Sequence, residues 1–142
     1  MTRHARGRRA LVLLLILPLL GCRGGGAPDD LPVEVAIQVA PTPPVVGPAL
    51  VMVDLLDAEG DDPVEGARVR LEGTMTHAGM VPVHAHAEER EPGHYRVEEF
   101  EFTMGGDWIL RVHIELKDGA EGVREFDLQV VSPPSSRGDA GP

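Results

Sequence analysis

The sequence predicts an all-β fold, a small antiparallel β-sandwich of about seven strands. Apolar and polar residues alternate with a period of two in several segments, most clearly from Trp108 to Leu116. Turns rich in Pro, Gly and Asp separate these segments at intervals of roughly 10–15 residues. Helix signals are few along the same stretch, so a layered arrangement of short strands is the fold class that fits.

The individual strands follow from this alternation. In chain order, they are expected over residues 33–39, 49–56, 67–72, 81–88, 95–102, 108–116 and 123–131. The first has Val33, Val35, Ile37 and Val39 on one face, and prolines end it because proline cannot donate to a sheet. Trp108 and Tyr95 are the expected core anchors. Seven strands in about 100 residues are typical of an immunoglobulin-like sandwich, here without a cysteine pair.

The two ends of the chain differ from this central domain. Residues 1–21 have an arginine-rich start and an apolar run at 10–20, which is too short for a membrane-spanning helix but suits an export signal. Residues 22–31 are rich in glycine and predict a flexible tether. Residues 32–131 form the expected domain, and residues 132–142 predict a disordered tail.

Cys22 is the only cysteine and follows Leu19-Leu20-Gly21, which resembles the lipobox of bacterial lipoproteins. In such a sequence the cysteine is lipidated and becomes the new N-terminus. Two or three acyl chains anchor a protein stably in a membrane. We therefore expect a lipid-anchored protein of the cell envelope. Because Arg23, and not an aspartate, follows the cysteine, the resemblance favours the outer membrane, with the domain facing the periplasm.

Charge restricts the partners of the chain. The whole sequence carries a net charge of −10, and all 23 acidic residues lie beyond the predicted signal segment. Phosphate groups would be repelled by such a surface, so nucleic acid is not an expected partner, whereas cations would be attracted.

A segment rich in methionine and histidine stands out as a candidate copper site. It contains Met75, His77, Met80, His84 and His86, and Met104 follows in a glycine-rich turn. Thioethers are soft ligands that select Cu(I), and imidazole binds both Cu(I) and Cu(II). His84 and His86 are two residues apart on a predicted strand, so their side chains share a face. Met80 has the same parity, whereas Met75 and His77 are expected on the preceding loop, and His94 and His113 are further candidates.

An alternative needs no metal. The histidines could form the solvated face of an edge strand, and the methionines could fill gaps at the end of the sandwich. The domain would then be a structural or interaction module of an envelope complex. Enzyme activity is not expected, because the serines lie only in the tail and the single cysteine is assigned to lipid.

Three elements resemble the YtkA-like/FixH-like family of envelope proteins: Pro63-Val64-x-Gly66-Ala67, Pro92-Gly93-x-Tyr95 and Met104-Gly105-Gly106-x-Trp108. The resemblance covers roughly residues 33–131. It implies an immunoglobulin-like sandwich and, from FixH-like relatives, a link to copper supply, with copper buffered or delivered to a receiving envelope protein. Those relatives carry a transmembrane helix where this chain has a lipobox, so the YtkA-like comparison is the better one.

Overall fold

The computed structural model describes residues 31–59, 62–76 and 79–132. These residues form seven strands: β1 (Val33–Ala40), β2 (Gly47–Asp57), β3 (Arg68–Met75), β4 (Val83–Glu91), β5 (His94–Phe102), β6 (Gly106–Glu115) and β7 (Glu121–Val130). The all-β fold class and the seven strands are confirmed. Within the described ranges, no helix is long and apolar enough to span a membrane.

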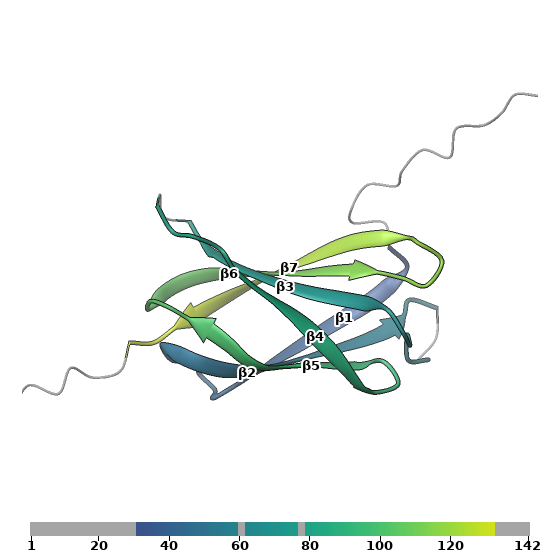
Figure 1. Cartoon of the computed structure of the whole chain (residues 1–142), viewed down its shortest axis with the longest axis horizontal. Coiled ribbons are helices and arrows are strands. Elements are labelled where there is room, and N and C mark those ends of the chain that lie inside the picture. The colour runs from purple at the N-terminus through teal and green to yellow at the C-terminus, as the bar shows by residue number, and fades with distance from the viewer. Residues whose placement is uncertain (1–30, 60–61, 77–78, 133–142) are drawn as a thin grey trace, which may run out of the picture.

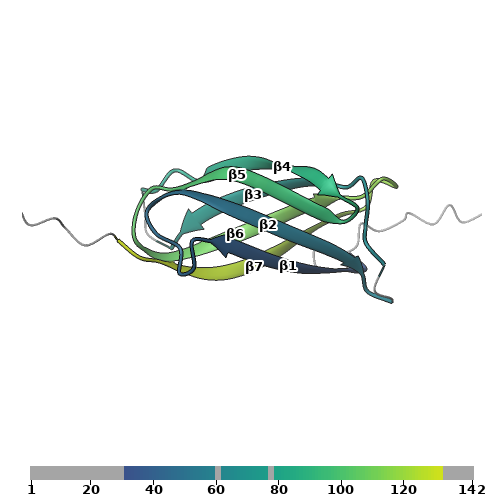
Figure 2. The same cartoon turned by 90° about the horizontal axis from the view of Figure 1, so that it is seen from below.

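All neighbouring strands pair antiparallel, in the order β1-β2-β5-β4-β3-β6-β7. The strands β3, β6 and β7 form one layer that lies over β1, β2 and β5, as Figures 1 and 2 show. Strand β4 joins the two layers. Its first half pairs with β3, its second half pairs with β5, and the register shifts between Glu89 and Glu91.

The core lies between the layers and is built from the inward-facing residue of each alternating pair. On β6 these residues are Trp108, Leu110, Val112 and Ile114, each at most 2 % exposed. The rings of Phe102 and Trp108 meet edge to face at 5.1 Å between centroids, and Tyr95 is 2 % exposed. Both predicted core anchors are therefore confirmed, because strand alternation is a local property that packing preserves.

The largest differences from the predicted strand limits are in β3 and β4. Strand β3 continues past Glu72 to Met75, because residues 73–75 pair with residues 108–110 of β6. Strand β4 begins only at Val83, after Pro82, and runs on to Glu91. The acidic residues Glu89 and Glu91, which lie beyond the predicted strand, are thus part of β4, since pairing with β5 extends it.

Candidate functional site

The residues predicted to bind copper lie in two separate places on the domain. One is the end of the sandwich where β3 ends and the β5–β6 turn lies, which we call the methionine end (Met75, Met80 and Met104). Figure 1 shows the β3–β4 connection and the β5–β6 turn at the same end of the molecule. The other is the outer surface of β4, β3, β6 and β7, which we call the outer face. His77 and Cys22 lie outside the described residues.

Met75 is the last residue of β3 and points into the core, with 7 % of its surface exposed. The prediction that it lies on a loop is wrong, because β3 extends to pair Met75 with Trp108. Its terminal methyl group lies against Gly106, where an added Cβ would come within 2.8 Å of it. Met75 therefore packs beside Trp108, on the opposite side of the sheet from His84.

Met104 and Met80 complete the methionine end. Met104 is 46 % exposed, and its backbone carbonyl accepts a hydrogen bond of 2.9 Å from the indole N–H of Trp108. Met80 is partly buried against the core. Because β4 starts three residues after Met80, its parity does not carry it onto the strand face of His84, and that expectation is corrected. Trp108 thus ties the β5–β6 turn to the end of β3.

His84 and His86 are both exposed on the outer face of β4, as the alternation predicted. The register sets Glu72 directly across from His84 and Arg70 directly across from His86. The Nη1 atom of Arg70 lies 3.2 Å from Nδ1 of His84. A guanidinium group can only donate, so Nδ1 accepts this hydrogen bond and the neutral ring carries its proton on Nε2. Neither ring nitrogen of His84 then offers a free lone pair to a metal ion.

Glu72 links several cationic groups on the outer face. Its carboxylate lies 2.9 Å from Nε2 of His113 and 3.1 Å from Nη1 of Arg111, which also bonds Glu125 at 2.6 Å. Partial burial raises the pKa of Glu72, but the hydrogen bonds from His113 and Arg111 outweigh it and leave the pKa below its usual value. Glu72 is therefore an ionised carboxylate already held by two donors.

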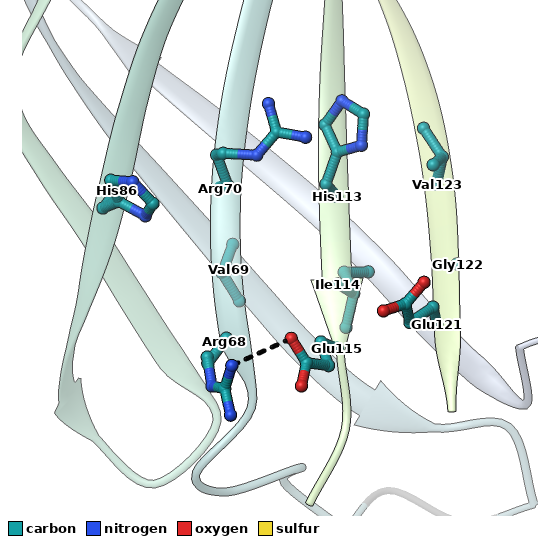
Figure 3. Close-up of a pocket in the computed structure, with 10 residues that line it drawn as sticks. All are labelled: Arg68, Val69, Arg70, His86, His113, Ile114, Glu115, Glu121, Gly122 and Val123. Carbon is teal, nitrogen blue, oxygen red and sulfur yellow. Dashed lines mark hydrogen bonds and ion pairs between the residues drawn. The ribbon is translucent and has the colours of Figure 1, made fainter. Parts of the chain in front are cut away.

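A shallow depression of about 470 Å³ lies beside this network. Figure 3 shows Arg70 on β3 between His86 on β4 and His113 on β6, with Arg68 paired to Glu115 at the lower rim. The row formed by His86, Arg70 and His113 contains no acidic residue, in contrast to the row of His84, Glu72, Arg111 and Glu125 next to it. The depression therefore contains a row of cationic and imidazole side chains, and Glu115 and Glu121 lie at its edge.

The remaining candidate, His94, lies on β5 in the other layer. Its Nδ1 is 2.6 Å from a carboxylate oxygen of Asp54, and this hydrogen bond raises the pKa of His94. In the described part of the chain, no three His, Cys, Asp or Glu side chains are grouped so that they could hold a metal ion. The sequence alone did not predict the contacts of Arg70 with His84 and of Glu72 with His113, because these contacts depend on strand register.

Two antiparallel layers with a shared β4 and a core around Trp108 and Tyr95 define a small immunoglobulin-like β-sandwich. The chain belongs to the YtkA-like family, whose model matches residues 30–113, so the resemblance seen in the sequence is confirmed. No curated protein matches the sequence.

Two solved structures are similar to this chain. One is the soluble domain of PmoD from Methylocystis sp. ATCC 49242 (Rockwell), with 16 % identity and a TM-score of 0.45 over 70 % of this chain and 90 % of that one. The other is murine CRIg, with 12 % identity and a TM-score of 0.41 over 70 % of this chain and 98 % of that one.

Proposed function

We propose that this chain is an envelope lipoprotein whose YtkA-like domain binds copper, as Cu(I), at the methionine end and buffers it or delivers it to a receiving envelope protein. One observation carries the proposal: Met75 pairs in register with Trp108, the Met104 carbonyl accepts a hydrogen bond from the Trp108 indole, and Met80 packs against the same hydrophobic core. Of the chain's other two methionines, Met52 lies on the outer side of β2 and Met1 outside the described residues.

The chemistry of these side chains suits Cu(I). Thioether sulfur is a soft ligand, and it persists in an oxidising compartment where a free thiol would not. Methionine is unbranched and has several rotatable bonds, so Met75 and Met80 can turn toward an ion that enters beside the exposed Met104. The net charge of −10 favours the approach of a cation.

This proposal moves the copper ligands away from the imidazoles of His84 and His86. An imidazole site would lose affinity below about pH 6, because protonation removes the ligand lone pair. Thioethers do not titrate, so the proposed site keeps its affinity between about pH 7.5 and pH 5. The dependence on pH therefore separates the two ligand sets.

The first prediction is tight one-to-one binding of Cu(I) that depends on the methionines. The test titrates the full chain in detergent against a chromogenic Cu(I) chelator, with Cys22→Ser in every variant so that no thiol competes. Replacing both Met75 and Met104 by Leu should weaken binding at least about tenfold, since each tenfold costs about 1.4 kcal/mol of binding free energy.

The matched control is Met52→Leu, which removes a thioether from a different surface and should leave affinity unchanged. The double variant His84→Ala/His86→Ala should also bind normally. Loss of affinity in the histidine variant, with none in the methionine variant, would reject the methionine end and restore the imidazole site. Failure of all variants and the parent chain to bind Cu(I) would reject copper handling.

The lipid anchor at Cys22 is part of the same proposal and rests on the sequence. Expressed in a bacterium, the full chain should lose residues 1–21 and gain two or three acyl chains on Cys22, which mass spectrometry of the purified protein would detect. Cys22→Ser should abolish the added mass. A wild-type chain with an unmodified cysteine thiol would exclude the lipoprotein assignment.

A metal-free interaction module is the second candidate, and an edge strand favours it. Strand β1 pairs only with β2 among the strands of the described sheet, and Glu34 is its only charged residue. Edges with so little charge can accept an added strand from a partner. If the chain fails the Cu(I) titration, this candidate becomes the better one.

A further inference from the structure

The outer face carries a set of side chains that would ordinarily attract divalent metal ions. His84 and His86 lie two residues apart on one face of β4, a spacing that lets two imidazoles approach the same ion. Glu72 lies directly across from His84 on β3, but these three described side chains are not grouped so that together they could hold a metal ion. Imidazole and carboxylate are ligands for Zn²⁺, Ni²⁺ and Cu²⁺.

The contacts of Arg70 oppose the binding of an ion by the two histidines. Arg70 pairs in register with His86 and donates to Nδ1 of His84 at 3.2 Å, which forces the proton of the His84 ring onto Nε2. The same guanidinium Nη1 lies 3.9 Å from the Glu72 carboxylate. A single side chain therefore contacts one potential ligand of each kind and places a permanent positive charge among them.

Arg111 and His113 reinforce this arrangement from the other side of β3. They hydrogen-bond the two oxygens of Glu72, whose side chain is 18 % exposed, so this carboxylate is engaged by two donors before any ion arrives. Arg111 is in turn held by Glu125. Arg70, in contrast, has a half-exposed side chain and a single hydrogen bond to His84, so its replacement is the change that frees the histidines.

We propose that Arg70 is a specificity-determining residue that keeps divalent metal ions off His84 and His86. It does so by occupying the lone pair of His84 and by repelling a cation from the surrounding face. The proposal concerns a different surface from the methionine end, and it stands whether or not Cu(I) binds there. If both proposals hold, the domain selects a soft monovalent ion at one end and rejects harder divalent ions at the outer face.

The size of the effect follows from charge alone. A unit charge about 5 Å from a divalent ion weakens its binding about tenfold or more, even with water-like screening. Freeing the lone pair of His84 adds to this. Arg70→Leu should therefore bind Ni²⁺ at least about tenfold more tightly than the parent chain at low ionic strength.

The experiment titrates nickel sulfate into the full chain in detergent by calorimetry, again with Cys22→Ser throughout. Arg68→Leu is the matched control, because Arg68 lies two residues earlier on the same face of β3 but pairs with Glu115 instead of a histidine. It should bind Ni²⁺ within about twofold of the parent, since its charge is already paired. Arg70→Gln, which keeps a polar side chain without the charge, is a second variant if the leucine disturbs the fold.

Three results would each overturn the proposal. The parent chain could bind Ni²⁺ as tightly as Arg70→Leu, Arg68→Leu could gain as much as Arg70→Leu, or the gain could persist in Arg70→Leu/His84→Ala. Adding Met75→Leu and Met104→Leu to Arg70→Leu should leave the Ni²⁺ gain intact. This combined variant separates a failure of the Arg70 proposal from a failure of the proposed Cu(I) site.

Discussion

Trp108→Ala should lower the free energy of unfolding by about 3–5 kcal/mol, the range found when a buried aromatic residue is truncated. Trp108 is 1 % exposed, and its ring packs edge to face against Phe102. The truncation leaves a cavity between the two layers and removes the indole donor to the Met104 carbonyl. Urea denaturation followed by circular dichroism would measure the loss.

Trp108→Phe separates the two contributions of this side chain. It keeps much of the apolar contact but deletes the indole N–H, so the loss should be smaller than for the alanine variant. Because the β5–β6 turn then loses its tie to Trp108, this variant should also weaken Cu(I) binding at the methionine end. A Trp108→Ala variant as stable as the parent chain would contradict the core described above.

Tyr95→Phe should lower the free energy of unfolding by about 1–3 kcal/mol, the penalty for leaving buried hydrogen-bonding groups without partners. The phenolic O–H donates to the Val64 carbonyl at 2.9 Å and accepts from the Ala67 N–H at 3.0 Å. These bonds hold the segment before β3 against the start of β5. The loss should appear as a lower urea midpoint with an unchanged denaturant dependence. An unchanged urea midpoint would show that the Tyr95 hydroxyl group contributes nothing to the stability of the fold.

Glu89 contacts the same two segments, the residues before β3 and the start of β5. It makes part of the stability of the domain depend on pH. Its carboxylate accepts hydrogen bonds from the Gly66 and Gly93 N–H groups and lies 3.2 Å from the Tyr95 hydroxyl. Burial raises the pKa of Glu89, but these hydrogen bonds outweigh it and lower the pKa below the ordinary value of 4.5. A lowered pKa in the folded state means that the stabilisation is present above pH 4.5 and disappears as the pH falls through the folded-state value.

The variant Glu89→Gln tests the direction in which stability changes with pH. It should be less stable than the parent chain at neutral pH, and the difference should shrink as the pH falls below 4.5. Glu101→Gln is a suitable control, since Glu101 is exposed near the end of β5, whereas Glu89 lies on β4. If the difference in stability between Glu89→Gln and the parent chain grew toward low pH, the hydrogen-bonded, ionised Glu89 carboxylate would be contradicted.

The structure also explains how the candidate site came to be divided between two surfaces. The sequence predicted one patch, because two of its methionines and three of its histidines lie within the twelve residues from Met75 to His86. In the fold, Met75 ends a strand and faces the core, whereas His84 lies on the outer face of the next strand. Residues that are close along the chain therefore do not have neighbouring side chains here, because successive residues of a strand point to opposite faces of the sheet.

The sequence by itself determined the approximate positions of the strands, the inward face of β6, and the core positions of Trp108 and Tyr95. These properties follow from the two-residue period of a strand and from the turn residues that interrupt it, both of which are local. The tertiary structure alone decided that β4 joins both layers, that β3 extends to Met75 and that Arg70 contacts His84. Those features depend on which strands pair and in what register, and register is set by contacts between segments distant in the chain.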